Sequence, residues 1–189
     1  CLVGSEMCKE TGRLTGYNTD VTGLRASLET FLGGERPERA LVLGTGGASQ
    51  AVQYVLAQME IPFDLVSRNP ATGNYTYDEV SDEVIGSHRL IINASPVGMH
   101  PNVEEAPRIP YAFVTPSHYL FDLIYNPAET LFLQYGAQRG AHTCNGLDML
   151  VGQAEAAWAN GTDKGSSDTA RPILSKPASF PTTSFSGPE

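Results

Sequence analysis

The stretch ALVLGTGGASQAVQYVLAQMEIPFDLVS, residues 40–67, decides the fold of this chain. Its apolar run at 40–43 predicts a buried strand, and the spacing of apolar residues predicts a helix over 48–59. The run at 61–67 is short, apolar and bounded by turn-forming residues, so it predicts a second buried strand and completes a βαβ unit. Two more continuous apolar runs follow at 90–92 and 119–121. Because such runs are typical of parallel strands covered on both faces, we expect an α/β fold with a doubly wound parallel sheet.

The composition is typical of a globular protein. With 189 residues, of which 41% are hydrophobic and 17% charged, the chain fits one domain or slightly more. Its 12 Lys and Arg residues against 21 Asp and Glu residues give a formal net charge of −9, which repels nucleic-acid phosphates, so we expect no nucleic-acid partner. No run of about 18 apolar residues could cross a membrane, and residues 1–10 lack the pattern of a signal peptide. We therefore expect a cytoplasmic protein that does not bind membranes.

The cysteines and histidines do not indicate a metal site. The three cysteines form no CxxC pair, and the four histidines show neither an HExxH motif nor paired spacing. We interpret the histidines as strand-end or surface residues. They are His88, His100, His118 and His142.

The flanking segments predict additional elements. Residues 1–7 and 14–17 predict a hairpin, and apolar residues at helical spacing predict a helix over 21–31 that ends at Gly33-Gly34. Further expected elements are a short helix near 77–84, a helix through 131–133, a strand near 141–143 and a last amphipathic helix over 146–158. After residue 160 the composition shifts to Gly, Ser, Thr and Pro, which predicts a disordered tail.

A glycine turn joins the first strand and helix of the βαβ unit. It consists of Gly44, Thr45, Gly46, Gly47 and Ala48. Glycine lets such a turn approach a pyrophosphate, and the helix N-terminus adds free N–H donors and a partial positive charge. Ser49 stands where the third glycine of a GxGxxG pattern would fall. The turn predicts a dinucleotide site in a Rossmann-like domain, with an ordinary tight turn as the alternative.

The end of the second strand indicates which dinucleotide fits. An NAD site carries Asp or Glu there, to accept a hydrogen bond from the ribose 2′-hydroxyl. Here the strand ends in Ser67-Arg68-Asn69, and Asp64 falls inside the strand, where we expect it to miss the ribose. A guanidinium suits the 2′-phosphate of NADP. The sequence therefore favours NADP as the cofactor, with a solvated strand-end role as the alternative for Arg68.

Five segments occur in order along the chain: GYNTD at 16–20, the glycine turn with Ser67-Arg68, INASPVGM at 92–99, DLIYNP at 122–127 and NGLDMLVGQA at 145–154. Together, over residues 1–159, they closely resemble the shikimate dehydrogenase family. That family reduces 3-dehydroshikimate to shikimate with NADPH, on the route to chorismate and the aromatic amino acids. The resemblance implies this reaction, a small-molecule substrate, and an active site between an N-terminal α/β substrate domain and a Rossmann domain.

The resemblance also implies a division of the chain. We expect a remnant of the substrate domain with a linking helix, an NADP-binding Rossmann domain, a final helix that returns to the cleft, and the disordered tail. The corresponding residues are 1–35, 36–145, 146–159 and 160–189.

Roles for single residues follow from the same resemblance. Asp20 matches an aspartate that pairs with a catalytic lysine and touches the substrate hydroxyls, although it also fits a helix cap. Tyr125 and Gln153 match residues that contact the substrate. The glycine turn, Ser67 and Arg68 match the pyrophosphate and 2′-phosphate contacts. Residues that match contacts to the nicotinamide half are Ala94, Ser95, Pro96, Leu123 and Gly146.

The chain departs from the family pattern in two respects. The catalytic lysine of the family belongs to a segment upstream of Cys1, and Lys9, Lys164 and Lys176 match nothing. We therefore expect an incomplete fragment that binds NADP weakly and does not turn over, because proton transfer and substrate positioning are both reduced. Many members also carry a second basic residue where Thr72 stands here.

Two alternative functions stay open. One is a quinate/shikimate dehydrogenase that uses NAD, which the missing acidic residue after the second strand disfavours. The other is a non-catalytic module that senses NADPH. Asp20, Tyr125 and Gln153 argue against a module of this kind, because a protein that only binds the cofactor needs none of them.

Overall fold

The computed structural model describes residues 5–10 and 13–147, and its centre is a six-stranded sheet. The strands are β3 Ala40–Leu43, β4 Phe63–Ser67, β5 Tyr75–Thr76, β6 Leu90–Asn93, β7 Tyr119–Asp122 and β8 His142–Cys144. They lie in the order β5-β4-β3-β6-β7-β8, and every neighbouring pair is parallel. The predicted parallel sheet is confirmed.

The chain order reverses at the centre of this sheet. From β3 the chain proceeds outward through β4 and β5 on one side, and through β6, β7 and β8 on the other. This is the strand order of the Rossmann fold. At the reversal point, between β3 and β6, the loops leave the carboxyl ends of the strands in opposite directions and open a crevice for ligands. The topology therefore confirms the doubly wound arrangement and places the candidate site at the ends of β3 and β6.

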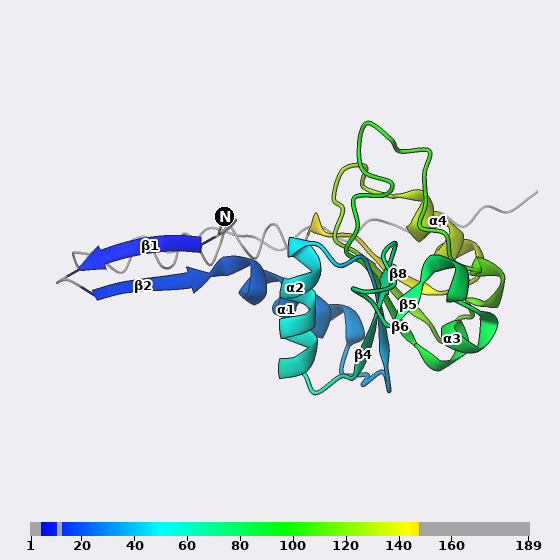
Figure 1. Ribbon diagram of the computed structural model, residues 1–189, viewed down its shortest axis with the longest axis horizontal. Coiled ribbons are helices and arrows are strands. Elements are labelled where there is room, and N and C mark those ends of the chain that lie inside the picture. Colours follow the sequence, from blue (N-terminus) through cyan, green and yellow to red (C-terminus); the bar gives the residue numbers. More distant parts are fainter. Residues whose placement is uncertain (1–4, 11–12, 148–189) are drawn as a thin grey trace, which may run out of the picture.

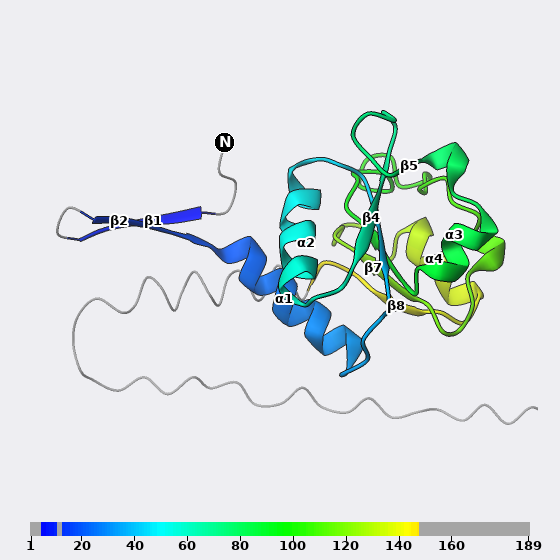
Figure 2. The same cartoon turned by 60° about the horizontal axis from the view of Figure 1, so that its bottom comes forward.

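Helices cover both faces of the sheet (Figures 1 and 2). The helices α1, Thr19–Leu32, and α2, Gly47–Gln58, pack on one face, and α3, Asp82–Ser87, and α4, Leu131–Gln138, pack on the other. Successive side chains of a strand point to opposite faces. Val42 accordingly joins the α1–α2 side, whereas Leu41 and Leu43 join the α3–α4 side. Each strand is buried on both faces, which explains why the strand sequences are continuous apolar runs.

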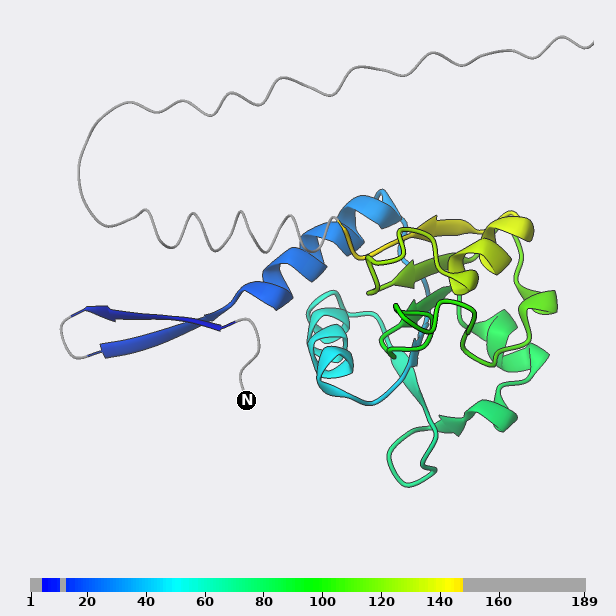
Figure 3. The same cartoon turned by 90° about the horizontal axis from the view of Figure 1, so that it is seen from above.

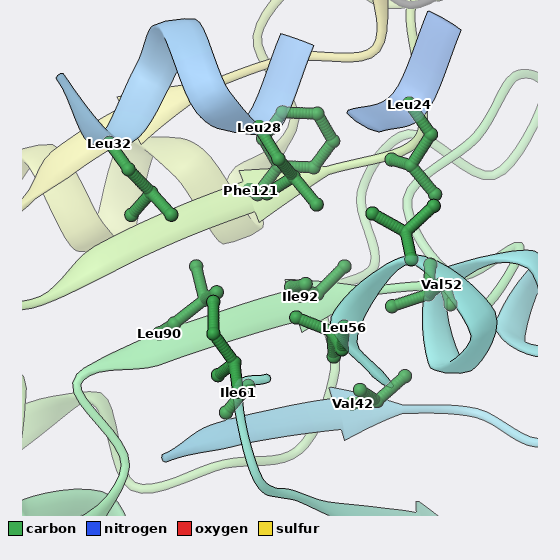
Figure 4. Close-up of a cluster of buried hydrophobic side chains, with 13 residues drawn as sticks. Leu24, Leu28, Leu32, Val42, Val52, Leu56, Ile61, Leu90, Ile92 and Phe121 are labelled. Carbon is green, nitrogen blue, oxygen red and sulfur yellow. The ribbon is translucent and has the colours of Figure 1, made fainter. Parts of the chain in front are cut away.

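Helix α1 contributes three leucines to the first of these layers. Leu24, Leu28 and Leu32 are at most 3% exposed. Figure 4 shows them in the same cluster as Ile92 and Phe121 of the sheet. Fully burying a leucine contributes about 1.5–3 kcal/mol, so these side chains fix α1 to the sheet.

An antiparallel hairpin precedes α1. It is formed by β1, Ser5–Glu10, and β2, Arg13–Asn18. The hairpin extends away from the sheet and its covering helices in all three views (Figures 1, 2 and 3). The predicted hairpin is confirmed, with its first strand shifted toward residue 10.

The segment between β4 and β6 differs from the prediction of one short helix. The chain forms β5, a 3₁₀ turn η1 at Tyr77–Glu79, and α3. Ser81 separates the two helical pieces, because its hydroxyl caps α3 by accepting from the N–H of Val84 (3.4 Å). A two-residue strand and a single helical turn are too short to show an apolar period, which explains why the sequence pattern missed them.

Some predicted features lie outside the described residues. They are most of the helix expected over 146–158, including Gln153, and the tail from 160 to 189. Within the described part, no helix combines the length and apolar character that a membrane crossing requires.

Candidate functional site

A cavity of about 1020 Å³ opens at the carboxyl edge of the sheet, where the strand order reverses. Residues that follow β3, β4 and β6 line it. The predicted site residues among them are Gly44, Thr45, Gly46, Ser67, Arg68, Ala94, Ser95 and Pro96. The lining also includes residues without a predicted role, notably Asn69, Thr72, Tyr77 and Arg108. Segments far apart in the sequence therefore meet at one site.

The glycine turn after β3 forms one wall. Gly44 has a φ of +108°, and a Cβ atom there would lie 3.2 Å from the carbonyl oxygen of Ala94. Glycine is therefore required for the close approach of the loop that follows β6. Gly46 is the N-cap of α2, which receives no side-chain cap and has no acidic residue in its first turn. The first N–H groups of α2, which begins at Gly47 and Ala48, are thus left for an anion.

Ser49 explains how the turn works without a third glycine. Its side chain is fully buried, and its hydroxyl accepts a hydrogen bond from Gln53 Nε2 (3.1 Å) within α2. The third glycine of the pattern serves the close packing of helix on strand. A serine that is small and internally hydrogen-bonded fits the same position.

The end of β4 presents Arg68 on a loop with an internal hydrogen-bond network. Ser67 is 4% exposed, and its hydroxyl accepts from the N–H of Asn69 (3.1 Å) and shares a hydrogen bond with Thr72 Oγ1 (2.7 Å). Thr72 Oγ1 also lies 3.0 Å from the carbonyl oxygen of Asn69. Arg68 is exposed and forms no hydrogen bond or ion pair with any described residue. The loop therefore holds its shape through Ser67 while the guanidinium faces the cavity.

Tyr77 connects this loop to the loop after β6. Burial raises the pKa of Tyr77, while a hydrogen bond with Ser95 and the charge of Arg68 lower it. The phenol is thus neutral at physiological pH and forms part of the cavity wall between Arg68 and Ser95. No pattern in the sequence distinguished this tyrosine from others in polar segments.

Asp64 lies inside β4, as predicted, and does not line the cavity. Its carboxylate accepts from Arg39 Nε (2.9 Å) and His88 Nε2 (3.0 Å). Two of the histidines, which were expected at strand ends or on the surface, lie near the starts of strands and are buried. His88 lies two residues before β6 and His118 directly precedes β7, and they are 1% and 3% exposed and bind buried acceptors. Asp64 is therefore committed to a structural cluster and is not available to a ribose.

Asn93, the last residue of β6, organises the loop at 94–97. Its Oδ1 accepts from the N–H (3.1 Å) and the hydroxyl (2.7 Å) of Ser95, and its Nδ2 donates to the carbonyl of Val97 (3.3 Å). The same Nδ2 donates to Asp122 Oδ1 (3.1 Å). Asn93 is fully buried, and its bond to Asp122 is buried with it, whereas its bonds to Ser95 and Val97 are partly buried. The side chain fixes the predicted cofactor loop and ties it to β7.

Asp122, the last residue of β7, is a fully buried carboxylate. Besides Asn93 it accepts from the backbone N–H of Ile124 (3.0 Å) and from Thr130 Oγ1 (2.6 Å). Burial raises the pKa of Asp122 to about 6, against the hydrogen bonds from Thr130, Ile124 and Asn93, which lower it. The sequence motifs contained Asn93 and Asp122 but assigned them no role. A polar residue that ends an apolar strand was the available signal.

The residues predicted to flank the nicotinamide half lie beside the end of β7. A Cβ atom at Gly146 would collide with the carbonyl group of Leu123, and the Gly146 N–H donates to the carbonyl of Ile124 (3.1 Å). The Leu123 N–H in turn donates to the carbonyl of Asn93 (3.1 Å). The structure thus brings Leu123, Gly146 and the loop after β6 together, although Leu123 and Gly146 do not line the large cavity.

The predicted substrate contacts are placed only in part. Tyr125 is 53% exposed in the loop after β7, outside the lining of the cavity. Asp20 is the second residue of α1, and Gln153 lies outside the described residues. Of the three predicted substrate contacts, the structure therefore describes the side chain of Tyr125 and the backbone of Asp20.

The cavity fits a phosphorylated dinucleotide. A helix start without a cap, a glycine turn and two guanidiniums all favour anions, and the end of β4 carries no carboxylate to bind a ribose hydroxyl. Among the described residues, no group of three His, Cys, Asp or Glu side chains could hold a metal ion. The donor set is that of a phosphate-binding site.

Comparisons with known proteins agree with this fit. No protein-family model matches the sequence. The shikimate dehydrogenase (NADP(+)) of Caldanaerobacter subterraneus subsp. tengcongensis is 37% identical over 164 residues, which cover 79% of this chain and 58% of that protein. A chorismate mutase/shikimate 5-dehydrogenase fusion protein from Clostridium acetobutylicum is 33% identical with a TM-score of 0.69, over 85% of this chain and 60% of that one.

A structure with both ligands is also similar. The shikimate 5-dehydrogenase of Thermus thermophilus, solved in complex with NADP(H) and shikimate, is 31% identical with a TM-score of 0.68. The match covers 82% of this chain and 60% of that one. The chain is therefore homologous to NADP-dependent shikimate dehydrogenases over about four fifths of its length, which confirms the resemblance. It spans only 58–60% of the length of these relatives.

Proposed function

We propose that this chain is the NADP-binding part of a shikimate dehydrogenase, which reduces 3-dehydroshikimate to shikimate with NADPH. The homology supports the reaction class. The observation that carries the cofactor choice is Arg68, an exposed guanidinium without a partner among the described residues, at the end of β4. The proposal includes a small-molecule substrate and a cytoplasmic location, in keeping with the composition of the chain.

Different described residues suit different parts of the cofactor. The turn at Gly44 and Gly46 and the first N–H groups of α2 suit the pyrophosphate, and Arg68 suits the 2′-phosphate. The loop at 94–96, with Leu123 and Gly146, borders the nicotinamide half. When bound, NADPH supplies a hydride to the carbonyl carbon of the substrate.

The substrate contacts are proposed from the matched motifs. Asp20, Tyr125 and Gln153 are the residues that we assign to the substrate hydroxyls. Hydride transfer to a carbonyl also needs a proton donor at its oxygen, which typically contributes about 10²–10⁴-fold in rate. We assign no such donor among the described residues.

Titration of the chain with NADPH and with NADH, followed by cofactor fluorescence, tests the proposal. We expect NADPH to bind about tenfold more tightly or better, because the 2′-phosphate forms charge-assisted hydrogen bonds that NADH lacks. Arg68→Ala should remove most of this preference and leave NADH binding within about twofold. Arg139→Ala is the matched control, because Arg139 is exposed and lies at the end of α4, outside the cavity.

The outcomes separate the alternatives. Equal affinity for NADPH and NADH in the wild type would remove the NADP assignment and favour a quinate/shikimate dehydrogenase that uses NAD. A chain specific for NADPH whose cofactor binding responds neither to shikimate nor to 3-dehydroshikimate would favour the NADPH-sensing module instead.

A further inference from the structure

A second arginine lines the cavity from the loop that follows β6. Arg68 and Arg108 are the cationic side chains of its lining. Both are exposed, and neither forms a hydrogen bond or ion pair with a described residue. Several other arginines of the described part are neutralised by carboxylates, namely Arg25, Arg36, Arg39 and Arg89. The two guanidiniums that remain at the cavity are free for an anion.

The segment that carries Arg108 is anchored. Pro107 and Ile109, its neighbours in the chain, are both buried. The hydroxyl of Tyr111 donates to the carbonyl of Pro107 (2.9 Å), and Ile109 packs in the cluster beneath α3 and α4. The backbone is thus fixed on both sides of Arg108 while its side chain stays exposed at the cavity.

The charges of the cavity lining favour a second cation for binding an anion. Its lining carries two carboxylates, Asp78 and Glu105, which match the two guanidiniums in number. Without Arg108 the ionisable lining would be net negative and would repel an anionic ligand. Thr72 cannot supply the charge, because it is neutral and its hydroxyl is engaged with Ser67.

The location of the cavity indicates which phosphate Arg108 would bind. The cavity includes the end of β4 with Arg68, Asn69 and Thr72, where the adenosine ribose lies in this fold, and it extends from there to the loop at 94–97. The N-terminus of α2 already suits the pyrophosphate there. We propose that Arg108 is a specificity-determining residue that binds the ribose 2′-phosphate together with Arg68. This inference rests on the proposed function, because the 2′-phosphate belongs to NADP.

Adenosine 2′,5′-bisphosphate and 5′-AMP differ only in the 2′-phosphate and therefore isolate this contact. Their affinities are measured by displacement of NADPH fluorescence for the wild type, Arg108→Ala, Arg68→Ala and the control Arg139→Ala. We expect Arg108→Ala to weaken the bisphosphate about tenfold and 5′-AMP by less than about twofold. Arg108→Lys should restore part of the loss, because lysine keeps the charge without the bidentate geometry. Thermal unfolding of each variant checks that the fold is intact.

The possible results separate the two proposals. If Arg108→Ala has the same affinity for the bisphosphate as Arg139→Ala, or loses affinity for the bisphosphate and 5′-AMP equally, Arg108 does not bind the 2′-phosphate. This inference is then wrong. If the wild type itself does not prefer the bisphosphate to 5′-AMP, the proposed NADP function fails. Loss of the preference in Arg68→Ala alone would retain the function and exclude Arg108.

Discussion

Asp122 shows how one buried side chain can hold several parts of the site. Its carboxylate receives donors from Asn93, Ile124 and Thr130, which lie at the end of β6, after β7 and at the start of α4. Through Asn93 it reaches the loop that contains Ser95. Burial of this charge costs free energy, and three hydrogen bonds offset only part of that cost. The pKa of Asp122 is therefore raised.

Replacement of Asp122 by Asn is expected to change the pH dependence of stability. The pKa of Asp122 is raised from 3.8 to about 6, so the folded state binds the proton more tightly than the unfolded state. This group therefore stabilises the fold at low pH, and its contribution is lost as the pH rises through about 6. We expect the free energy of unfolding of the wild type, relative to Asp122→Asn, to fall between about pH 4 and pH 6 and to be constant above about pH 7. Urea unfolding at a series of pH values measures it.

Asp122→Ala provides the contrast. Asparagine retains an acceptor for Ile124 and Asn93, and Thr130 Oγ1 can turn to accept from the new amide. Alanine leaves these buried donors without a partner, at about 1–3 kcal/mol each, so we expect a much larger loss of stability. If the difference in free energy of unfolding between wild type and Asp122→Asn does not vary with pH, the pKa of Asp122 is not raised in the folded protein.

The sequence located residues of the cavity lining where a strand end or a motif marked them. Arg68 is an example, because it follows an apolar strand directly. Arg108 was missed because it lies in a long loop, and only the tertiary structure brings it to the cavity. Tyr77 was missed for the same reason. The roles proposed for Asp20, Tyr125 and Gln153 stay predictions.

At the scale of elements, the turn between β3 and α2 separates two uses of glycine. Gly44 needs its positive φ and lies against Ala94, whereas Gly46 has an ordinary φ of −78° and nothing within 4 Å of its Cβ position. The first glycine serves the fold. The second leaves space at the start of α2, where a phosphate would approach.

Gly44→Ala is expected to lower stability, whereas Gly46→Ala is expected to weaken NADPH binding. Gly44→Ala should lower the free energy of unfolding by about 1–3 kcal/mol, since alanine is strained at that φ and pushes on the loop at Ala94. Gly46→Ala should change stability by less than about 1 kcal/mol. Its methyl group should nevertheless weaken NADPH binding about tenfold by blocking close approach of the pyrophosphate. Urea unfolding and NADPH titration measure the two effects.

Each variant is the control for the other. If Gly46→Ala binds NADPH as the wild type does, the pyrophosphate does not approach this turn. If Gly44→Ala is as stable as the wild type, the contact with Ala94 does not require glycine.

Elements were predictable where they were long enough to carry a period. The buried strands and the helices α1, α2 and α4 follow from apolar runs and helical spacing, and each was placed to within a few residues. The strand β5 depends on pairing with Val66 and Ser67 of β4, a tertiary contact that two residues cannot encode locally. The η1 turn begins after Thr76, which donates to Glu79 Oε2 through its N–H (2.7 Å) and hydroxyl (2.9 Å), and α3 begins at a cap formed by Ser81. Periodicity detects neither feature.

At the scale of the whole molecule, net charge and local charge oppose each other. The chain carries a formal charge of −9, which repels a polyanionic cofactor at long range. The cavity counters this with Arg68, Arg108 and the positive end of α2. The carboxylate of Asp64 is paired with Arg39 and His88 outside the cavity, so the carboxylates of the lining are Asp78 and Glu105.

Truncation tests where the nucleotide-binding unit begins. The hairpin at 5–18 extends away from the sheet, whereas Leu24, Leu28 and Leu32 of α1 are buried in the core. Removal of residues 1–18 should therefore preserve cooperative urea unfolding and NADPH affinity. Removal of residues 1–34 should abolish both, because three buried leucines contribute about 1.5–3 kcal/mol each, against a total stability of about 5–15 kcal/mol. If the shorter protein still folds and binds NADPH, the unit begins after residue 35, as the sequence-based division predicts, and the packing of α1 on the sheet is dispensable.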